Sequence, residues 1–477
     1  MVALVLAFGS SARELDLSLP DMGSSAGVVM TPTEEGRLGQ AFMRSVRRSL
    51  DLSSDPLLTD YVESLGQRLA AASGAGGHHF TFFLIEAPLI NAFAGPGGYI
   101  GIYSGLILAT DSESELAAVV AHEIAHVTQR HIMRSFEDTQ RLSGPATAAL
   151  VAAAILGAQV SPQAGAAALA GVQAAAVQRQ INFTRHNEQE ADRIGIGTLA
   201  RSGFDPHAMP VFFERLSKAS RMYENNAPEF LRTHPVTSNR IADSLGRADQ
   251  HPYRQRADDI RYFLVRATLR ADSFDTPKHA ISHFRSTLQD NRYRNQDAER
   301  YGLALSLLRA GDYAAARSEL KRLLGKSPQQ EAYIILDAQL DQQTGQSQRA
   351  LTSLSKALGL MPQSFPLNMA YAEALLAVDK PDRALTALQQ ASALRPDDGS
   401  IYKQMADAAI QANQPAKAHG YRAEYHYLNG QLEPAIHQLE YALRDRNLDF
   451  YEAAKLEARL KAIKAEQEAS DKDKERG

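Results

Sequence analysis

Two histidines and a glutamate in the first third of the chain have the types and spacing of a zinc site. His122, Glu123 and His126 form the pattern His-Glu-x-x-His. On a helix, residues i and i+4 lie one turn apart on the same face, so both imidazoles can bind one zinc ion. Glu123 is offset from them, where its carboxylate can take a proton from a zinc-activated water. The pattern therefore predicts a zinc hydrolase with one ion per chain.

A catalytic zinc needs a third protein ligand, and the absence of cysteine leaves only histidines and carboxylates to supply it. The acidic segment Asn187–Asp192 offers candidates on a second predicted helix. Glu188 and Asp192 share a helix face, so Glu188 as ligand leaves Asp192 able to hydrogen-bond a ligand imidazole. Glu190 points to roughly the opposite side. We therefore prefer Glu188 to Glu190 as ligand, against the simpler interpretation of a solvated acidic helix face.

His234 and Arg240 are the next candidates, near the end of the predicted catalytic half. Pro235 favours an extended backbone at His234, which places this histidine in a loop. There His234 could be a fourth, displaceable zinc ligand or could donate to the oxyanion of peptide hydrolysis. Arg240 is the alternative oxyanion partner. A helix-capping role for His234 and an ion-paired role for Arg240 stay open. Three other histidines are predicted not to be ligands: His78, His79 and His131.

These side chains need a buried helix and a small sheet to position them. Ser112–Phe136 has the pattern of a long helix, with Ser112 as its N-cap and Glu115 completing a capping box. The aromatic and β-branched segment His79–Glu86 predicts a strand, and Tyr99–Ile102 predicts a second strand after a Gly/Pro turn. The sequence thus favours a helical domain built around a few strands.

Two apolar segments raise the question of a membrane. Gly144–Val177 is rich in Ala, Val and Leu, but its longest apolar run, Ala146–Val160, is shorter than the ~20 residues of a membrane span. We therefore predict packed or lipid-surface helices there, which allows peripheral membrane contact. Val2–Gly9 is apolar and precedes small residues suited to signal-peptidase cleavage. Because no basic residue precedes Arg13, residues 1–12 are interpreted as the end of an export signal that starts upstream.

The second half of the chain repeats a helical unit. Alanines recur every 34 residues, and prolines keep the same step at positions 328, 362 and 396; the alanines are Ala316, Ala350, Ala384 and Ala418. This period, with small residues where helices cross, indicates tetratricopeptide repeats. We therefore predict a mainly α chain, with a zincin-like metallopeptidase domain and small β-sheet at 35–256 and an α-solenoid at 262–460. The charged tail, 461–477, is expected to fray.

Bulk composition limits the classes of function. The formal net charge is −4, from 51 basic and 55 acidic residues, which gives no sign of nucleic-acid binding. A length of 477 residues is enough for two or three domains, each with its own core. Together with the repeats, this composition favours protein substrates and protein partners.

Three motifs together resemble one known family. HEIAH at 122–126, NEQEADRIG at 187–195 and THPVTSNRI at 233–241 resemble the gluzincins that include the HtpX heat-shock proteases and the CAAX prenyl proteases. The resemblance covers residues 35–250. It implies that Glu188 is the third zinc ligand and that Asp192 supports the ligands from outside.

The resemblance also implies a substrate-binding edge strand, because Asn91–Ile100 looks like the family's edge-strand motif. An extended peptide can pair with the free backbone groups of such a strand. The residues carried over to it are Asn91, Ala92, Phe93, Gly98 and Tyr99.

Family members that combine this peptidase with tetratricopeptide repeats are periplasmic. The resemblance therefore implies degradation of misassembled outer-membrane proteins in the periplasm, with the repeats contacting clients or the barrel assembly machinery. The alternative is a chaperone or scaffold, in which the repeats act and the zinc site is largely occluded. A membrane-embedded prenyl protease would need several spans that this sequence lacks.

Overall fold

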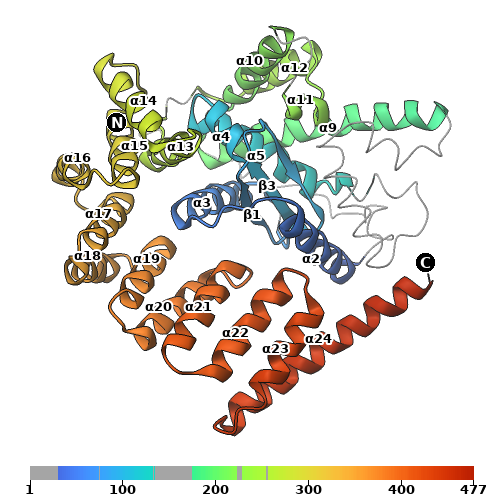
Figure 1. The fold of residues 1–477 in the computed structure, drawn as a ribbon. Coiled ribbons are helices and arrows are strands. Elements are labelled where there is room, and N and C mark those ends of the chain that lie inside the picture. The colour runs from blue at the N-terminus through green and yellow to red at the C-terminus, as the bar shows by residue number, and fades with distance from the viewer. Residues whose placement is uncertain are drawn as a thin grey trace, which may run out of the picture.

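The computed structural model describes residues 31–74, 76–132, 134, 174–222, 228–253 and 256–476. Figure 1 shows a small sheet with helices around it, and a long arc of helix pairs that curves around this domain. The predicted fold class, a mainly helical domain with a small sheet followed by an α-solenoid, is confirmed. Among the described helices, none combines the length and the apolar character needed to cross a membrane. The predicted export signal and most of the apolar stretch Gly144–Val177 lie outside the described residues.

The sheet has three strands in the order β1-β3-β2. β1 (Thr81–Ile85) runs parallel to the central strand β3 (Tyr99–Tyr103), and β2 (Ala92–Ala94) pairs antiparallel with the other side of β3. The two predicted strands are therefore present with slightly different bounds. β2 is an edge strand, in agreement with the placement of Ala92 and Phe93. Tyr99, however, begins the central strand, so its predicted place on the edge is wrong.

A tight turn joins the edge strand to the central strand. It consists of the 3-10 segment η1 (Pro96–Gly98), so Gly98 also lies on the turn rather than on the edge strand. Gly98 has a φ of +80°, and a Cβ added there would come within 1.9 Å of the carbonyl oxygen of His79. Only glycine fits both conditions, which explains the Gly-rich sequence at this turn.

Helix α5 (Glu113–Thr128) runs through the centre of the first domain and is buried along almost its whole length. The Ser112 hydroxyl accepts a hydrogen bond from the amide of Glu115, as predicted for an N-cap. The predicted capping box is not closed, because the Glu115 carboxylate accepts from the Asp111 amide and pairs with Arg215. The helix also ends before the predicted Phe136. Its last residue is Thr128, and two turn residues follow.

The other helices of this domain pack around α5 and the sheet. The largest hydrophobic cluster joins α3 and α5 to the sheet, and it contains Leu65, Phe82, Ile102 and Val119. The helices are α2 (Pro32–Ser49), α3 (Pro56–Ala72), α4 (Ser104–Ala109), α9 (Ala174–Ser202), α10 (Ala208–Met222), α11 (Glu229–Thr233) and α12 (Ser238–Ala248).

Paired antiparallel helices form the second half of the described chain. The four alanines at the 34-residue step are all buried, as expected where two helices cross closely. The helices are α13 (Ile260–Asp272), α14 (Pro277–Gln289), α15 (Gln296–Arg309), α16 (Tyr313–Lys326), α17 (Glu331–Gln343), α18 (Ser347–Leu360), α19 (Phe365–Leu376), α20 (Pro381–Leu394), α21 (Gly399–Gln411), α22 (Pro415–Leu428), α23 (Leu432–Ala442) and α24 (Phe450–Arg476).

The predicted fraying of residues 461–477 is wrong for the part of the tail whose side chains the structure describes. α24 continues through the tail, and Ile463 is fully buried against α22 and α23. Glu466 pairs with Arg44 of α2, so α24 contacts α2. Some charged side chains of the tail therefore pair with other helices, and others face the solvent.

The helical arc also contacts the first domain at α3. Asp60 of α3 pairs with Arg261 at 2.5 Å and with Arg395 at 2.8 Å, and these arginines come from opposite parts of the arc. One carboxylate thus joins α3 to two distant repeats. Because α3 also packs against the sheet and α5, the arc and the small domain form a continuous packed structure.

Substitution of Ala316 by leucine is expected to lower the free energy of unfolding by about 1–3 kcal/mol, because extra methylene groups do not fit a close helix crossing. Ala316 is fully buried on α16. Ala314 on the same helix is exposed, so Ala314→Leu is the matched control and should change stability by less than about 0.5 kcal/mol. Urea denaturation followed by circular dichroism measures both. Equal effects of the two substitutions would mean that the alanine period does not mark the helix crossings.

Candidate metal centre

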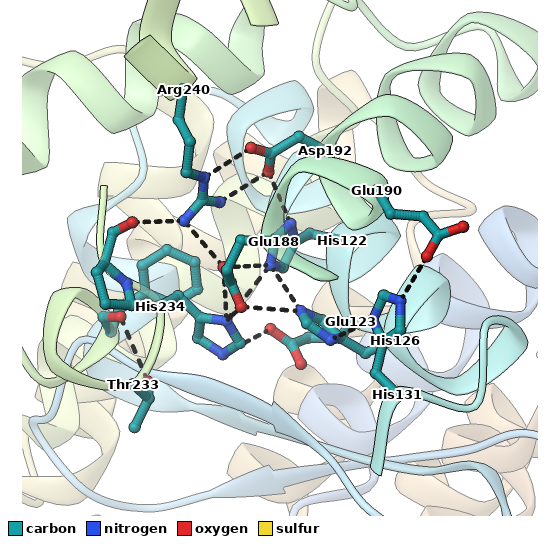
Figure 2. Close-up of polar contacts among 12 residues, drawn as sticks. His122, Glu123, His126, His131, Glu188, Glu190, Asp192, Thr233, His234 and Arg240 are labelled. Carbon is teal, nitrogen blue, oxygen red and sulfur yellow. Dashed lines mark hydrogen bonds and ion pairs between the residues drawn. The ribbon is translucent and has the colours of Figure 1, made fainter. Parts of the chain in front are cut away.

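Helix α5 places His122, Glu123 and His126 in the middle of the protein. The preceding residues, Ala117–Ala121, are all buried apolar residues with no helix breaker among them. His122 and His126 lie one turn apart, as expected, and their Nε2 atoms are 3.0 Å from each other. Both rings therefore direct a nitrogen at the same point, which Figure 2 shows at the centre of the cluster.

Helix α9 packs along α5 and supplies the carboxylates (Figure 1). Glu188 lies between the two histidines, with Oε2 3.4 Å from His122 Nε2 and Oε1 3.4 Å from His126 Nε2. Asp192 lies one turn further along α9, and its Oδ1 is 2.9 Å from the other ring nitrogen of His122, Nδ1. The structure thus brings together the carboxylate preferred as ligand and the carboxylate expected to support a ligand imidazole.

His234 reaches the same point from the loop after α11. Its amide donates to the carbonyl of Phe230 at 2.7 Å, and its ring stacks on the Phe230 ring with centroids 4.9 Å apart. This packing directs Nδ1 at the cluster, 3.0 Å from Glu188 Oε1 and 3.4 Å from His122 Nε2. The predicted loop position of His234 therefore agrees with the structure.

Four side chains together have the donor set and spacing of a zinc site. His122, His126, Glu188 and His234 each offer one atom, and these atoms all lie within 4.8 Å of one another. In a tetrahedral zinc site with bonds of 2.0–2.1 Å, neighbouring donors are about 3.3 Å apart. The contacts given above range from 3.0 to 3.4 Å. Three imidazoles and one carboxylate at this spacing fit a zinc ion, and hard cations such as Ca²⁺ would prefer more oxygen ligands.

Burial and neighbouring charges set the protonation of these groups. Burial disfavours a charged His122, but Asp192 and Glu188 outweigh it and raise the pKa of His122 to about 10. Burial and the adjacent His122 hold the pKa of His126 well below its usual value. Burial would raise the pKa of Glu188, but His234 and His122 more than compensate and hold this pKa well below its usual value. Glu188 is therefore an anion, ready to bind a cation.

Glu123 has an unusual environment for a carboxylate. Its side chain is almost fully buried, yet Oε1 has no hydrogen-bond partner among the described residues. The Nε2 atom of His234 lies 3.5 Å from this oxygen. A buried carboxylate oxygen without a partner is costly unless water or a ligand completes its surroundings. The position beside the donor cluster is the one that a water-activating base would need.

Arg240 binds the carboxylates from the side away from Glu123 (Figure 2). Its Nε and Nη2 donate to the two oxygens of Asp192, both at 2.8 Å, and Nη1 contacts Glu188 and the carbonyl of Pro235. Burial would lower the pKa of Arg240, but Asp192 and Glu188 raise it above its usual value. The guanidinium is thus engaged on all three nitrogens. This geometry contradicts the prediction that Arg240 meets the oxyanion and agrees with the ion-paired alternative.

The edge strand begins next to the His234 loop. The amide of Phe230 donates to the carbonyl of Ile90 at 3.0 Å, which ties α11 to the residues before β2. Asn91 is fully buried, and its Oδ1 accepts from the Ala92 amide at 3.0 Å. The Thr233 hydroxyl is 3.5 Å from the same oxygen. The edge strand and the candidate fourth donor are therefore parts of one connected region.

Two residues that are not expected to be zinc ligands lie against this cluster. His131 was predicted not to be a ligand and Glu190 was the less favoured acid, and neither belongs to the four-donor group. The structure nevertheless places the His131 ring next to His126 and the Glu190 carboxylate next to His131. Their sequence positions gave no local signal of this contact, because it depends on where α5 ends. The other two excluded histidines, His78 and His79, are also absent from the donor group.

Comparisons with known proteins agree with this geometry. The sequence profile of peptidase family M48 matches residues 56–248, and a tetratricopeptide repeat profile matches residues 342–406. The beta-barrel assembly-enhancing protease of Escherichia coli K12 is 43% identical over 70% of this chain and 68% of its own length. The protein of the same name from Yersinia pestis is 42% identical over 68% of this chain and 66% of its own length.

A more distant relative matches a smaller share of the chain. The mitochondrial metalloendopeptidase OMA1 of Schizosaccharomyces pombe is 32% identical over 38% of this chain and 51% of its own length. The chain spans about two thirds of the length of the two bacterial relatives. The range matched by the M48 profile, residues 56–248, includes the segments that carry the histidines and carboxylates of the cluster.

Proposed function

This chain belongs to peptidase family M48, a family of metalloproteases, and we propose that it is a zinc-dependent endopeptidase acting on misfolded or misassembled proteins. One observation carries the proposal. Three imidazoles and a carboxylate lie at the spacing of a tetrahedral zinc site, with the buried Glu123 beside them. A functional role explains that combination better than a structural one, because clustered buried histidines and a buried carboxylate oxygen without a hydrogen bond are unfavourable for stability.

We assign His122, His126 and Glu188 as the resident zinc ligands. His234 is a fourth ligand, which water or substrate displaces. Bound zinc would polarise the scissile carbonyl and make the attacking water more acidic. Glu123 takes the proton from that water and passes it to the leaving nitrogen. His234, moved away from the donor position, donates a hydrogen bond to the developing oxyanion. Arg240 holds Asp192 and Glu188 in place, and Asp192 in turn orients His122.

The substrate is proposed to lie along β2 in an extended conformation. Ala92 and Phe93 lie on this edge strand, and Asn91 precedes it beside the His234 loop. Main-chain hydrogen bonds to an edge strand recognise a peptide largely independently of its side chains. Such recognition suits a protease whose substrates share an unfolded conformation rather than a sequence.

The repeats are proposed to select the clients. Tetratricopeptide repeats form extended surfaces that bind protein segments. The names of the bacterial relatives refer to β-barrel assembly. These names support outer-membrane proteins as clients, the barrel assembly machinery as a partner and the periplasm as the location of this chain.

Removal of metal tests the proposed function directly. Treatment with 1,10-phenanthroline is expected to abolish cleavage of casein, and addition of Zn²⁺ to restore it. Metal analysis should find about one zinc per chain, because one donor group supplies the site. Mg²⁺ or Ca²⁺ is the matched control and should not restore cleavage, since these ions prefer oxygen ligands. Casein cleavage by fully metal-free protein would contradict the proposal.

A second function, that of a chaperone or scaffold, is favoured by the position of His234. Its side chain is only 11% exposed, and Nδ1 lies within contact distance of the other donors. A fourth ligand bound permanently there would leave no position for the attacking water. In that case the zinc-loaded chain would suppress aggregation of unfolded proteins through its repeats without cleaving them, and the casein assay distinguishes the two functions.

A further inference from the structure

A chain of contacts extends outward from His126 on the side away from Glu188. His131 Nδ1 lies 2.9 Å from His126 Nδ1, and the two rings are nearly perpendicular, at 77°. On its other side, His131 Nε2 lies 3.1 Å from Glu190 Oε2. Arg134 Nη1 donates to the same carboxylate oxygen at 3.1 Å. Figure 2 shows the rings and the carboxylate in sequence, with His131 between His126 and Glu190.

The end of α5 makes this contact possible. In a continuous helix, residues five apart point about 140° away from each other, so His131 could not face His126. Here the helix ends at Thr128, and Arg130 has a φ of +52°. A left-handed residue at this position ends the regular helical path, as at many helix C-termini. Arg130 is held in this position by Glu35 of α2, at 2.9 Å.

Helix α9 provides the outer carboxylate from the same segment that provides Glu188. Glu190 lies two residues beyond Glu188 and two residues before Asp192. Asp192 reaches His122, and Glu190 reaches His131. One short stretch of α9 therefore supplies the ligand carboxylate of Glu188 and two outer carboxylates. Asp192 contacts His122 directly, and Glu190 reaches His126 through His131.

We propose that His131, held by Glu190, is a positioning residue that orients His126 for zinc binding. This inference rests on the proposed function. To bind zinc through Nε2, His126 must carry its proton on Nδ1, and His131 Nδ1 is the acceptor for that proton. His131 then carries its own proton on Nε2, which donates to Glu190. Each ring nitrogen of His126 and His131 then has one defined role, so the contacts fix the orientation of the His126 ring.

The structure distinguishes this role from that of a ligand. His131 is buried, with its ring edge against His126, and it is outside the group of atoms within 4.8 Å of one another. It contacts Nδ1 of His126, whereas Nε2 of His126 faces the other zinc-binding atoms. His131 therefore acts on the metal only through His126.

Three substitutions of His131 separate the role of each ring nitrogen. Asparagine places its amide where Nδ1 lies, so His131→Asn keeps an acceptor for His126. Glutamine places its amide near the position of Nε2, so His131→Gln keeps only the contact with Glu190. His131→Ala keeps neither. The matched control is His207→Ala, which removes an imidazole bound between Asp205 and Asp249 far from the cluster.

Zinc affinity, measured by competition with a chromophoric chelator, is the main readout. Loss of an outer hydrogen bond to a ligand histidine weakens metal binding by about 10–100-fold, and we expect this loss for His131→Ala and His131→Gln. His131→Asn should bind zinc within about threefold of wild type, since it keeps the hydrogen bond that matters. The visible absorption of Co²⁺-substituted protein should change in the same two variants only.

The asparagine and glutamine variants both fill the space of the ring, so their comparison stays informative if the alanine variant does not fold. Equal zinc affinity for these two variants would overturn the inference, whether both match wild type or both are weakened. Absence of zinc binding by wild type would instead overturn the proposed function. The two failures are therefore distinguishable in one series of measurements.

Discussion

Glu123→Gln is expected to lower kcat for casein cleavage by about 10²–10⁴-fold, the contribution of a positioned general base. Glutamine keeps the size of the side chain but cannot accept a proton from the attacking water. Zinc binding should not change, because Glu123 lies outside the four-donor group. The free energy of unfolding should stay the same or rise, since the substitution removes a buried carboxylate whose Oε1 has no partner among the described residues.

Zinc content, kcat and urea denaturation are measured together on the purified variant. Glu115→Gln is the matched control, because Glu115 is also a buried carboxylate on α5 but pairs with Arg215 at the other end of the helix. It should lose stability and keep activity, the reverse of the pattern expected for Glu123→Gln. A Glu123→Gln variant that loses zinc, or that cleaves casein at the wild-type rate, would remove Glu123 from the role of base.

The parts of the site that depend on helix periodicity could be predicted from the sequence. His122 and His126 face one point because a helix repeats every 3.6 residues, and Glu188 and Asp192 share a face for the same reason. The alanine period likewise located the helix crossings of the repeats. In each case the geometry is local, and the residue spacing alone determines it.

The parts that depend on tertiary packing could not be predicted. The turn at Arg130 follows from a left-handed residue that is not glycine, held by an arginine–glutamate pair 95 residues apart in sequence. His131 meets His126 only because of that turn. The local sequence pattern gives no sign of the turn and instead predicts a continuous helix. In the same way, the charged residues 461–468 remain helical because Ile463 is buried and Glu466 pairs with Arg44. Such long-range contacts leave no periodic signal in the sequence.

Arg240 illustrates the same limit within the site. The sequence could not tell whether this guanidinium meets substrate or protein, because both uses need a buried, positive side chain near the ligands. The structure commits it to Asp192 and Glu188. Figure 2 shows Glu188 between Arg240 and the imidazoles, and Asp192 between Arg240 and His122. These contacts with Arg240 orient both carboxylates toward the imidazoles.

The second large effect is expected from Glu188→Gln. This substitution should lower zinc affinity by more than ~100-fold, the largest loss expected when only a hydrogen bond to a ligand histidine is removed. Glu188 is the only carboxylate in the donor group found among the described residues. A neutral amide is a weaker zinc ligand and does not offset the charge of the ion. Casein cleavage should fall in proportion to zinc occupancy, as measured by metal analysis after gel filtration. Full zinc retention by this variant would show that another residue is the third ligand.

His234→Ala is the control that separates a resident ligand from a displaceable one. It removes one donor from the same cluster, but it leaves His122, His126 and Glu188, which are enough for a catalytic zinc site. Zinc should therefore remain bound in His234→Ala, unlike in Glu188→Gln. If His234 blocks the water position at rest, cleavage should rise in this variant; if it mainly donates to the oxyanion, kcat should fall by about 10²–10³-fold with zinc retained. Zinc loss equal to that of Glu188→Gln would mean that the two residues are equivalent ligands, and the assignment of an open fourth position would be wrong.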